Sequence, residues 1–147
     1  MTRERALAIV NPAAGKGLGA RIATTIAGEL AAAGVSADVV VTPGPGQAVR
    51  LASRAVEEGY ERVIAVGGDG TANEVANGLV DTTTALALYP IGSGNDFARA
   101  LGYPRRRRDV ASFIAAARPR RIDVGEVNGR AFLNAAGVGI EIGRAHV

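Results

Sequence analysis

The feature that most constrains this chain is an apolar run that leads into a glycine-rich turn and then into a helical pattern. Val63 to Val66 predicts a buried strand, and Gly67-Gly68-Asp69-Gly70-Thr71 follows it directly. Apolar residues at helical spacing then continue to about Leu79. Glycines in such a turn let the backbone approach a ligand, and the helix N-terminus presents free N–H groups that suit phosphate. The segment therefore predicts a phosphate-binding loop.

The same alternation of apolar strand and helix recurs along the chain. Because the strands are unbroken apolar runs joined by helices, we expect an α/β fold, a three-layer Rossmann-like lobe with a mainly parallel sheet. Its binding crevice should lie at the carboxyl ends of the strands. The predicted strands are 6–10, 37–41, 63–66 and 85–91, and the predicted helices are 22–33, 48–58, the segment from the glycine turn to 79, 96–101 and 110–117.

The pattern changes after Pro119. Asn128-Gly129 joins two extended segments, 121–128 and 130–134, and predicts a β-hairpin. We therefore expect an α/β lobe over residues 1–120 and the start of a β-rich second lobe over 121–147, truncated with its last strand unpartnered. Residues 142–147 can be encoded by a common sequencing adapter, so we also expect a sequencing artefact there, which the coding DNA would test.

Composition limits the classes of protein to which the chain can belong. Hydrophobic residues make up 48% and charged residues 21%, as in globular domains. No apolar run approaches the length of a transmembrane segment, and no secretory signal pattern opens the chain. Cysteine is absent, which favours a cytoplasmic location and excludes thiolate metal sites. The single histidine, His146, makes histidine-based catalysis a poor hypothesis.

The positive charge is carried almost entirely by arginine, with Lys16 as the only lysine and a net charge of +3. Arginines cluster at 105–108 and again at 118, 120 and 121. They predict either a solvated surface or a patch that meets anionic lipid headgroups. Nucleic acid ranks last as a partner, because no aromatic residues interleave with the arginines.

Two familiar nucleotide motifs are excluded by spacing. A Walker A loop would need a glycine where Val10 stands and a Ser or Thr after Lys16. A dinucleotide-binding fingerprint fails as well, since the glycines at 15, 17 and 19 lack its spacing. The second strand also ends at Thr42 rather than at an acidic residue.

Three loops remain, and together they are specific: Asn11-Pro-Ala-Ala-Gly-Lys-Gly17, Gly67 to Asn73, and Pro90-Ile-Gly-Ser-Gly-Asn-Asp-Phe-Ala-Arg99. This trio resembles the catalytic lobe of the diacylglycerol kinase family, in particular the bacterial lipid kinases, from about Ala6 to Ile140. The middle motif alone is shared with NAD kinases. Sphingosine kinases are similar too, but the loop from Asn95 to Arg99 is closer to the diacylglycerol branch.

The resemblance implies ATP and Mg²⁺ as cofactors and a set of contact residues. Three acids would form a water-mediated magnesium network: Asp69, Asp96 and Asp123. The ATP contacts would come from Asn11, Pro12, Ala13, Ala14, Gly15, Lys16, Thr42, Gly67, Gly68, Asp69, Gly70, Thr71, Ala72, Asn73, Gly92, Ser93 and Gly94.

Simpler roles stay open for many of these residues. The glycines could serve only as turn residues, and Asp69 could only cap its helix. Lys16 could be an exposed loop residue. Asp96 could complement a helix dipole, and Asp123 could simply begin a strand.

The resemblance implies transfer of the ATP γ-phosphate to a lipid hydroxyl at a membrane surface, as in phospholipid biosynthesis. It places the proton acceptor beyond Val147, so we expect this chain alone to be inactive or nearly so. We expect a peripheral location at the inner membrane surface, no nucleic acid partner, and a homodimer as one option. Two alternatives remain: a soluble NAD kinase-like enzyme, and a catalytically inactive nucleotide-binding fragment.

Overall fold

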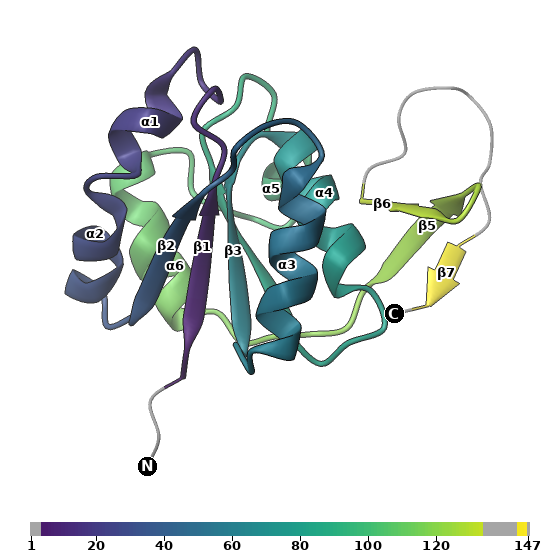
Figure 1. The fold of residues 1–147 in the computed structure, drawn as a ribbon. Helices are drawn as coiled ribbons and strands as arrows, with labels where there is room; N and C mark the ends of the chain where they lie inside the picture. Colours follow the sequence, from purple (N-terminus) through teal and green to yellow (C-terminus); the bar gives the residue numbers. More distant parts are fainter. Residues whose placement is uncertain (1–3, 134–143, 147) are drawn as a thin grey trace.

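The computed structural model describes residues 4–133 and, for the backbone only, 144–146. Helices flank a four-stranded sheet, and a smaller sheet lies to one side (Figure 1). The elements of the α/β part are β1 (Ala6–Val10), α1 (Leu18–Ile22), α2 (Ile26–Ala32), β2 (Ala37–Val41), α3 (Gln47–Glu57), β3 (Arg62–Gly67), α4 (Asp69–Leu79), β4 (Ala85–Pro90), α5 (Asp96–Ala100), a 3₁₀ turn (Arg107–Asp109) and α6 (Val110–Ala116). The smaller sheet comprises β5 (Asp123–Val127), β6 (Arg130–Phe132) and β7 (Arg144–His146).

The larger sheet is wholly parallel, in the order β2-β1-β3-β4. Val10 is in register with Val41 on one side and with Val66 on the other, so these three strands end level with one another. The loops that follow them therefore meet at one edge of the sheet. This is the edge at which open α/β sheets bind ligands.

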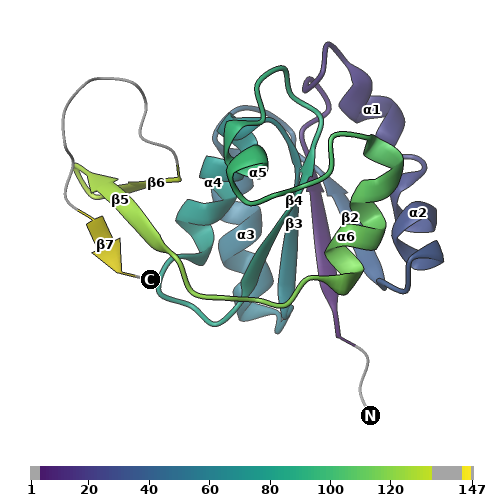
Figure 2. The same ribbon diagram turned by 180° about the vertical axis from the view of Figure 1, so that it is seen from behind.

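Helices cover both faces of this sheet (Figures 1 and 2). One face packs against α1, α2 and α6, with Ile26, Leu30 and Ile114 fully buried. The other face packs against α3, α4 and α5, with Val75 fully buried. Successive residues of β3 alternate between the two faces, as Ile64 and Val63 do, which is why an unbroken apolar strand is stable here. The prediction of a three-layer α/β lobe is confirmed.

The predicted helix over 22–33 is wrong in its boundaries. The chain forms two shorter helices, α1 and α2, with a turn between them, and α1 begins at Leu18, before the predicted start at residue 22. The hydroxyls of Thr24 and Thr25 donate to the carbonyl oxygens of Arg21 and Ile22, at 2.7 and 3.4 Å. Such local bonds compete with the regular helical pattern and interrupt it. The other elements lie within about two residues of their predicted limits.

The smaller sheet is antiparallel, in the order β6-β5-β7. The predicted hairpin is confirmed, and its turn residues Asn128 and Gly129 both have positive φ, 51° and 79°. The expectation of an unpartnered last strand is wrong, because 144–146 pair with β5. Asn134, at the end of the predicted second hairpin strand, and residues 142, 143 and 147 of the predicted tail lie outside the described residues.

Candidate active site at the carboxyl edge of the sheet

The first loop leaves β1 at Asn11, whose side chain links two loops. Its Oδ1 accepts the N–H of Ala13 at 3.1 Å, and its Nδ2 donates to Thr71 Oγ1 in the second loop at 3.2 Å. Three successive residues then have positive φ, Gly15 at 63°, Lys16 at 57° and Gly17 at 90°. This backbone is uncommon for a lysine, and such departures gather at functional sites. The Lys16 side chain is exposed.

The second loop is the start of α4. Gly68 precedes the helix in an extended conformation, and the first N–H with a partner on the helical pattern is that of Ala72, which donates to the Gly68 carbonyl oxygen. The N–H groups of the first turn, at Asp69, Gly70 and Thr71, therefore have no partner in the helical pattern. They give this end of α4 a partial positive charge that favours an anion.

The third loop follows β4 and is folded around Asn95. The Asn95 side chain accepts the N–H of Gly92 at 2.9 Å and donates to the Gly92 carbonyl oxygen at 2.8 Å. Asn95 itself has a left-handed backbone, with φ of 53°. Its carboxamide thus bonds within the loop and does not cap α5.

Close backbone contacts hold the three loops together. A Cβ on Gly92 would lie 2.5 Å from the Cα of Gly68, and a Cβ on Gly15 would lie 2.5 Å from the Ile91 carbonyl oxygen. Both distances are shorter than a side chain can tolerate, so glycine is required at these positions by the approach of another loop. The first and second loops each pack against the third, and Asn11 joins the first to the second.

Asp69 has a role that sequence reasoning missed. Its two carboxylate oxygens accept the N–H groups of Asp96 at 3.1 Å and Phe97 at 3.2 Å, so Asp69 caps α5 rather than its own helix. Asp69 and Asp96 are 27 residues apart in sequence, so only the tertiary fold brings them together. A carboxylate at a helix N-terminus is favoured by the helix dipole and by the hydrogen bonds.

The acids of the predicted magnesium network fall into two groups. Asp69 Oδ2 and Asp96 Oδ1 lie 3.3 and 3.6 Å from the point where a Cβ on Gly94 would be, so the two carboxylates face a common space. Asp123 lies at the start of β5, in the smaller sheet. Within residues 4–133, no three acidic or histidine side chains come close enough to hold a metal ion directly. The water-mediated network stays a prediction.

The remaining predicted contact residues are placed around these loops. Thr42 is buried at the end of β2, and its N–H donates to the Val10 carbonyl oxygen at 2.8 Å. Ala72 is buried in α4, and Ser93 is exposed in the third loop. Asn73 lies one turn into α4 and accepts the N–H of Leu133 at 2.8 Å. Its contact with a nucleotide stays a prediction.

A fully buried tyrosine, Tyr89, has a pKa raised well above its ordinary value. Tyr89 on β4 donates its hydroxyl to Glu29 on α2. Burial first, and then the hydrogen bond to Glu29, raise the pKa of Tyr89 well above its usual range. Glu29 and the exposed arginines 106–108 line a shallow hollow on this side of the molecule. The residues that line the hollow carry a net positive charge, because three are arginines and one is a glutamate.

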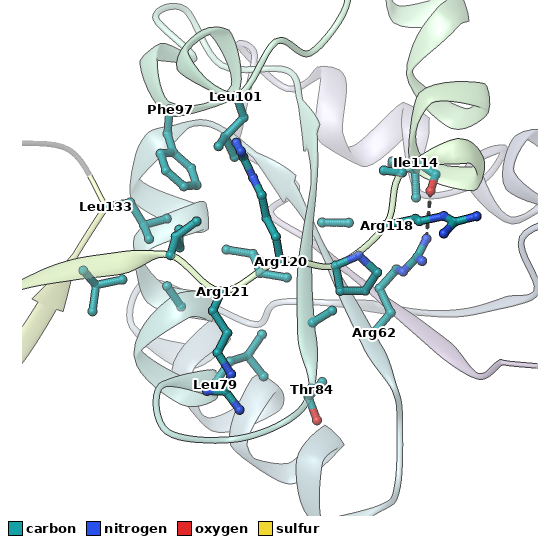
Figure 3. Close-up of a pocket in the computed structure, with 18 of the residues that line it drawn as sticks. Arg62, Leu79, Thr84, Phe97, Leu101, Ile114, Arg118, Arg120, Arg121 and Leu133 are labelled. Carbon is teal, nitrogen blue, oxygen red and sulfur yellow. Dashed lines mark hydrogen bonds between the residues drawn. The ribbon is translucent and has the colours of Figure 1, made fainter. Parts of the chain in front are cut away.

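A larger cavity of about 640 Å³ lies elsewhere, beneath the segment that joins α6 to β5 (Figure 3). Its walls are largely apolar and include Leu79, Phe97, Leu101 and Leu133, while Arg118, Arg120 and Arg121 come from the joining segment. None of the predicted ATP-contact residues lines it. The three converging loops, rather than this cavity, are therefore the candidate active site.

Comparison with known proteins identifies the family. The model of the diacylglycerol kinase catalytic domain matches residues 5–127. The chain belongs to this family. It is 37% identical over 139 residues to a diacylglycerol kinase of Staphylococcus saprophyticus and 38% identical over 139 residues to one of Bacillus subtilis. A crystal structure of a diacylglycerol kinase from Bacillus anthracis superposes with a TM-score of 0.78 at 35% identity.

The match covers nearly all of this chain but only part of each relative. It spans 93% and 92% of the chain and 46% of each of the two relatives named. For the Bacillus anthracis structure it spans 91% of this chain and 50% of that one. The chain therefore corresponds to about half the length of these diacylglycerol kinases. In the part of the chain that the structure describes, no helix is long and apolar enough to cross a membrane.

Proposed function

We propose that this chain is the ATP-binding lobe of a lipid kinase that transfers the γ-phosphate of ATP to the hydroxyl of a diacylglycerol-like lipid. The observation that carries the proposal is the convergence of the three loops at one edge of the sheet, with the free end of α4 between them. Membership in the diacylglycerol kinase catalytic family supports the choice of a lipid acceptor over NAD.

In this proposal the protein binds and orients the phosphates. The first-turn N–H groups of α4 face the phosphate chain, and Gly67, Gly68 and Gly92 have no side chains that would keep it from the backbone. Phosphoryl transfer depends mainly on such positioning and on neutralising charge. Asp69 and Asp96, which share a space at Gly94, would hold Mg²⁺ through water, and the ion would offset the negative charge of the phosphates.

We also propose that residues 1–120 form the nucleotide lobe and that 121–147 begin a second lobe. The two relatives are each about twice as long as the match, so the lipid site and the proton acceptor would lie in the half that this chain does not match. The exposed arginines 105–108 suit an anionic membrane surface, which would bring the protein to its lipid from the cytoplasmic side. A homodimer is a further option.

Incubating the purified chain with Mg²⁺, radiolabelled ATP and either diacylglycerol vesicles or NAD tests the proposal. We expect saturable ATP binding with little or no phosphate transferred to either acceptor. Rapid phosphorylation of extractable lipid would show that the acceptor half is dispensable, while confirming the lipid specificity. Formation of NADP would favour the NAD kinase alternative, and absence of ATP binding would overturn the proposed nucleotide site.

A further inference from the structure

The outer edge of β6 is paired with side chains of α4 instead of with another strand. Asn77 Nδ2 donates to the Ala131 carbonyl oxygen at 2.8 Å, and the Ala131 N–H donates to Asn77 Oδ1 at 2.8 Å. One residue of an antiparallel strand makes this same pair of bonds to the residue opposite it. The Asn77 carboxamide thus takes the place of a neighbouring strand.

A second asparagine continues the pairing one helical turn earlier. Asn73 Oδ1 accepts the N–H of Leu133 at 2.8 Å. Four residues of helix advance about 6 Å, and two residues of strand advance about 6.8 Å. The spacing from Asn73 to Asn77 therefore matches the spacing from Leu133 to Ala131, with α4 and β6 running in opposite directions.

The orientation of the Asn77 amide is fixed by a further bond. Its Nδ2 also donates to the Asn73 carbonyl oxygen at 2.8 Å, so both hydrogens of the amide are used. An aspartate at position 77 would direct a carboxylate oxygen at two carbonyl oxygens, and an alanine would leave the Ala131 edge unpaired. Buried polar groups that are left without partners destabilise the folded protein, and Ala131 is a buried residue.

These asparagines share one face of α4 with Asp69, since residues 69, 73 and 77 are spaced four apart. Asp69 holds the N-terminus of α5, Asn73 holds Leu133 and Asn77 holds Ala131. We call the three residues the α4 polar seam. The seam joins the third loop and the smaller sheet to the helix whose first turn lies in the candidate active site.

We propose that Asn73 and Asn77 are positioning residues that couple the nucleotide loop to the smaller sheet. This rests on the proposed function, because the loop must hold a nucleotide. A nucleotide that fixes the first turn of α4 also fixes Asn73, which begins the next turn, and so stabilises the edge of β6. By reciprocity, pairing at that edge strengthens nucleotide binding by the same factor.

Amide hydrogen exchange on the whole 147-residue chain, followed by NMR with and without MgATP, tests the coupling. We expect MgATP to shift the Gly67, Gly68 and Gly70 resonances and to slow exchange at Ala131 and Leu133 at least threefold. In Asn77→Asp, exchange at Ala131 should be at least tenfold faster and should no longer respond to MgATP. The affinity for MgATP should fall by the same factor by which MgATP slows this exchange in the wild type. Unchanged exchange at Ile9 and Val66 would show that the variant is folded.

Asn128→Asp is the matched control, because it makes the same amide-to-carboxylate change in the β5–β6 turn, away from α4. It should keep the wild-type response. Shifts at the glycines without slower exchange at Ala131 and Leu133 would overturn the coupling and leave the nucleotide site intact. Wild-type exchange in Asn77→Asp would overturn the seam itself. Absence of glycine shifts would overturn the proposed function and the coupling together.

Discussion

The two sheets of this chain are stabilised in different ways. The four-stranded sheet lies between two layers of helices, and every residue of β3 is buried. The three-stranded sheet has only one buried residue in β5, Val124, and its β6 edge is joined to the rest of the molecule by the amides of Asn73 and Asn77. Many apolar side chains therefore hold the larger sheet in place, whereas the β6 edge of the smaller sheet is attached through two amides.

The edges of the two sheets show the same contrast. On β4, one of the two edge strands of the larger sheet, the Leu88 N–H donates to the hydroxyl of Tyr103 at 3.0 Å, and Pro90 has no N–H to offer. On β6, Asn77 provides both a donor and an acceptor. Side chains bond to the backbone at the β4 edge and at the β6 edge. Of these two, only the β6 edge bonds to α4, the helix whose first turn lies in the candidate active site.

The largest expected effect comes from Gly92→Ala, in the loop region of the larger sheet. The new methyl group would lie 2.5 Å from the Gly68 backbone, so the two loops must separate. We expect a loss of about 2–3 kcal/mol in the free energy of unfolding, together with loss of ATP binding. Gly70→Ala is the control, since no atom lies within 4 Å of its Cβ position. Urea denaturation measures the free energy of unfolding of both variants. Equal stability of the two would contradict the packing of the loops.

Asp69→Ala should have the next largest effect, because it removes the cap of α5 and one end of the seam. We expect about 1–2 kcal/mol of lost stability, with faster amide exchange at Asp96 and Phe97. Asp69→Asn keeps one oxygen acceptor and should lose less. If Asp69→Ala were as stable as the wild type, the capping contact would not exist in solution.

Tyr103→Phe compares the two edges directly. The ring packs against Phe113 with centroids 4.4 Å apart, and the phenylalanine keeps this contact. Only the acceptor for the Leu88 N–H is lost, and we expect about 1 kcal/mol of lost stability with no change in exchange at Ala131. Faster exchange at Ala131 would show that the two edges are not independent.

The smallest effect concerns pH and the larger sheet alone. Burial and the bond to Glu29 raise the pKa of Tyr89 in the folded protein, whereas an unfolded tyrosine titrates near pH 10. As the pH rises, the unfolded chain therefore loses this proton before the folded protein does. The contribution of Tyr89 to the free energy of unfolding is complete below about pH 10 and declines as the pH rises further. Tyr89→Phe should flatten that decline by up to about 1.4 kcal/mol per pH unit. Identical pH profiles for the two proteins would contradict the assignment.

Sequence reasoning could predict the larger sheet because each of its determinants is local. Apolar runs such as Val63 to Val66 and the glycines after them indicate strand, loop and helix without further information. The break at Thr24 and Thr25 was missed because hydroxyl bonds to the backbone compete closely with helix continuation.

The smaller sheet and the cap of α5 depend on contacts between distant residues. Two asparagines four apart on a helix ordinarily indicate a solvated face, and only the position of β6 turns them into a pairing surface. Asp69 likewise accepts hydrogen bonds from residues 27 and 28 positions away. The one available signal was the alignment of residues 69, 73 and 77 on a single helical face.

Titration of the ¹⁵N-labelled chain with MgATP tests the central claim most directly. If the three loops form one nucleotide site, the amides of Gly15, Gly67, Gly68, Gly70 and Gly92 should shift together along a single saturating curve. Amides that border the apolar cavity, such as those of Thr83 and Arg120, should shift little. Shifts confined to the cavity, or separate curves for the three loops, would contradict a single site at the edge of the sheet.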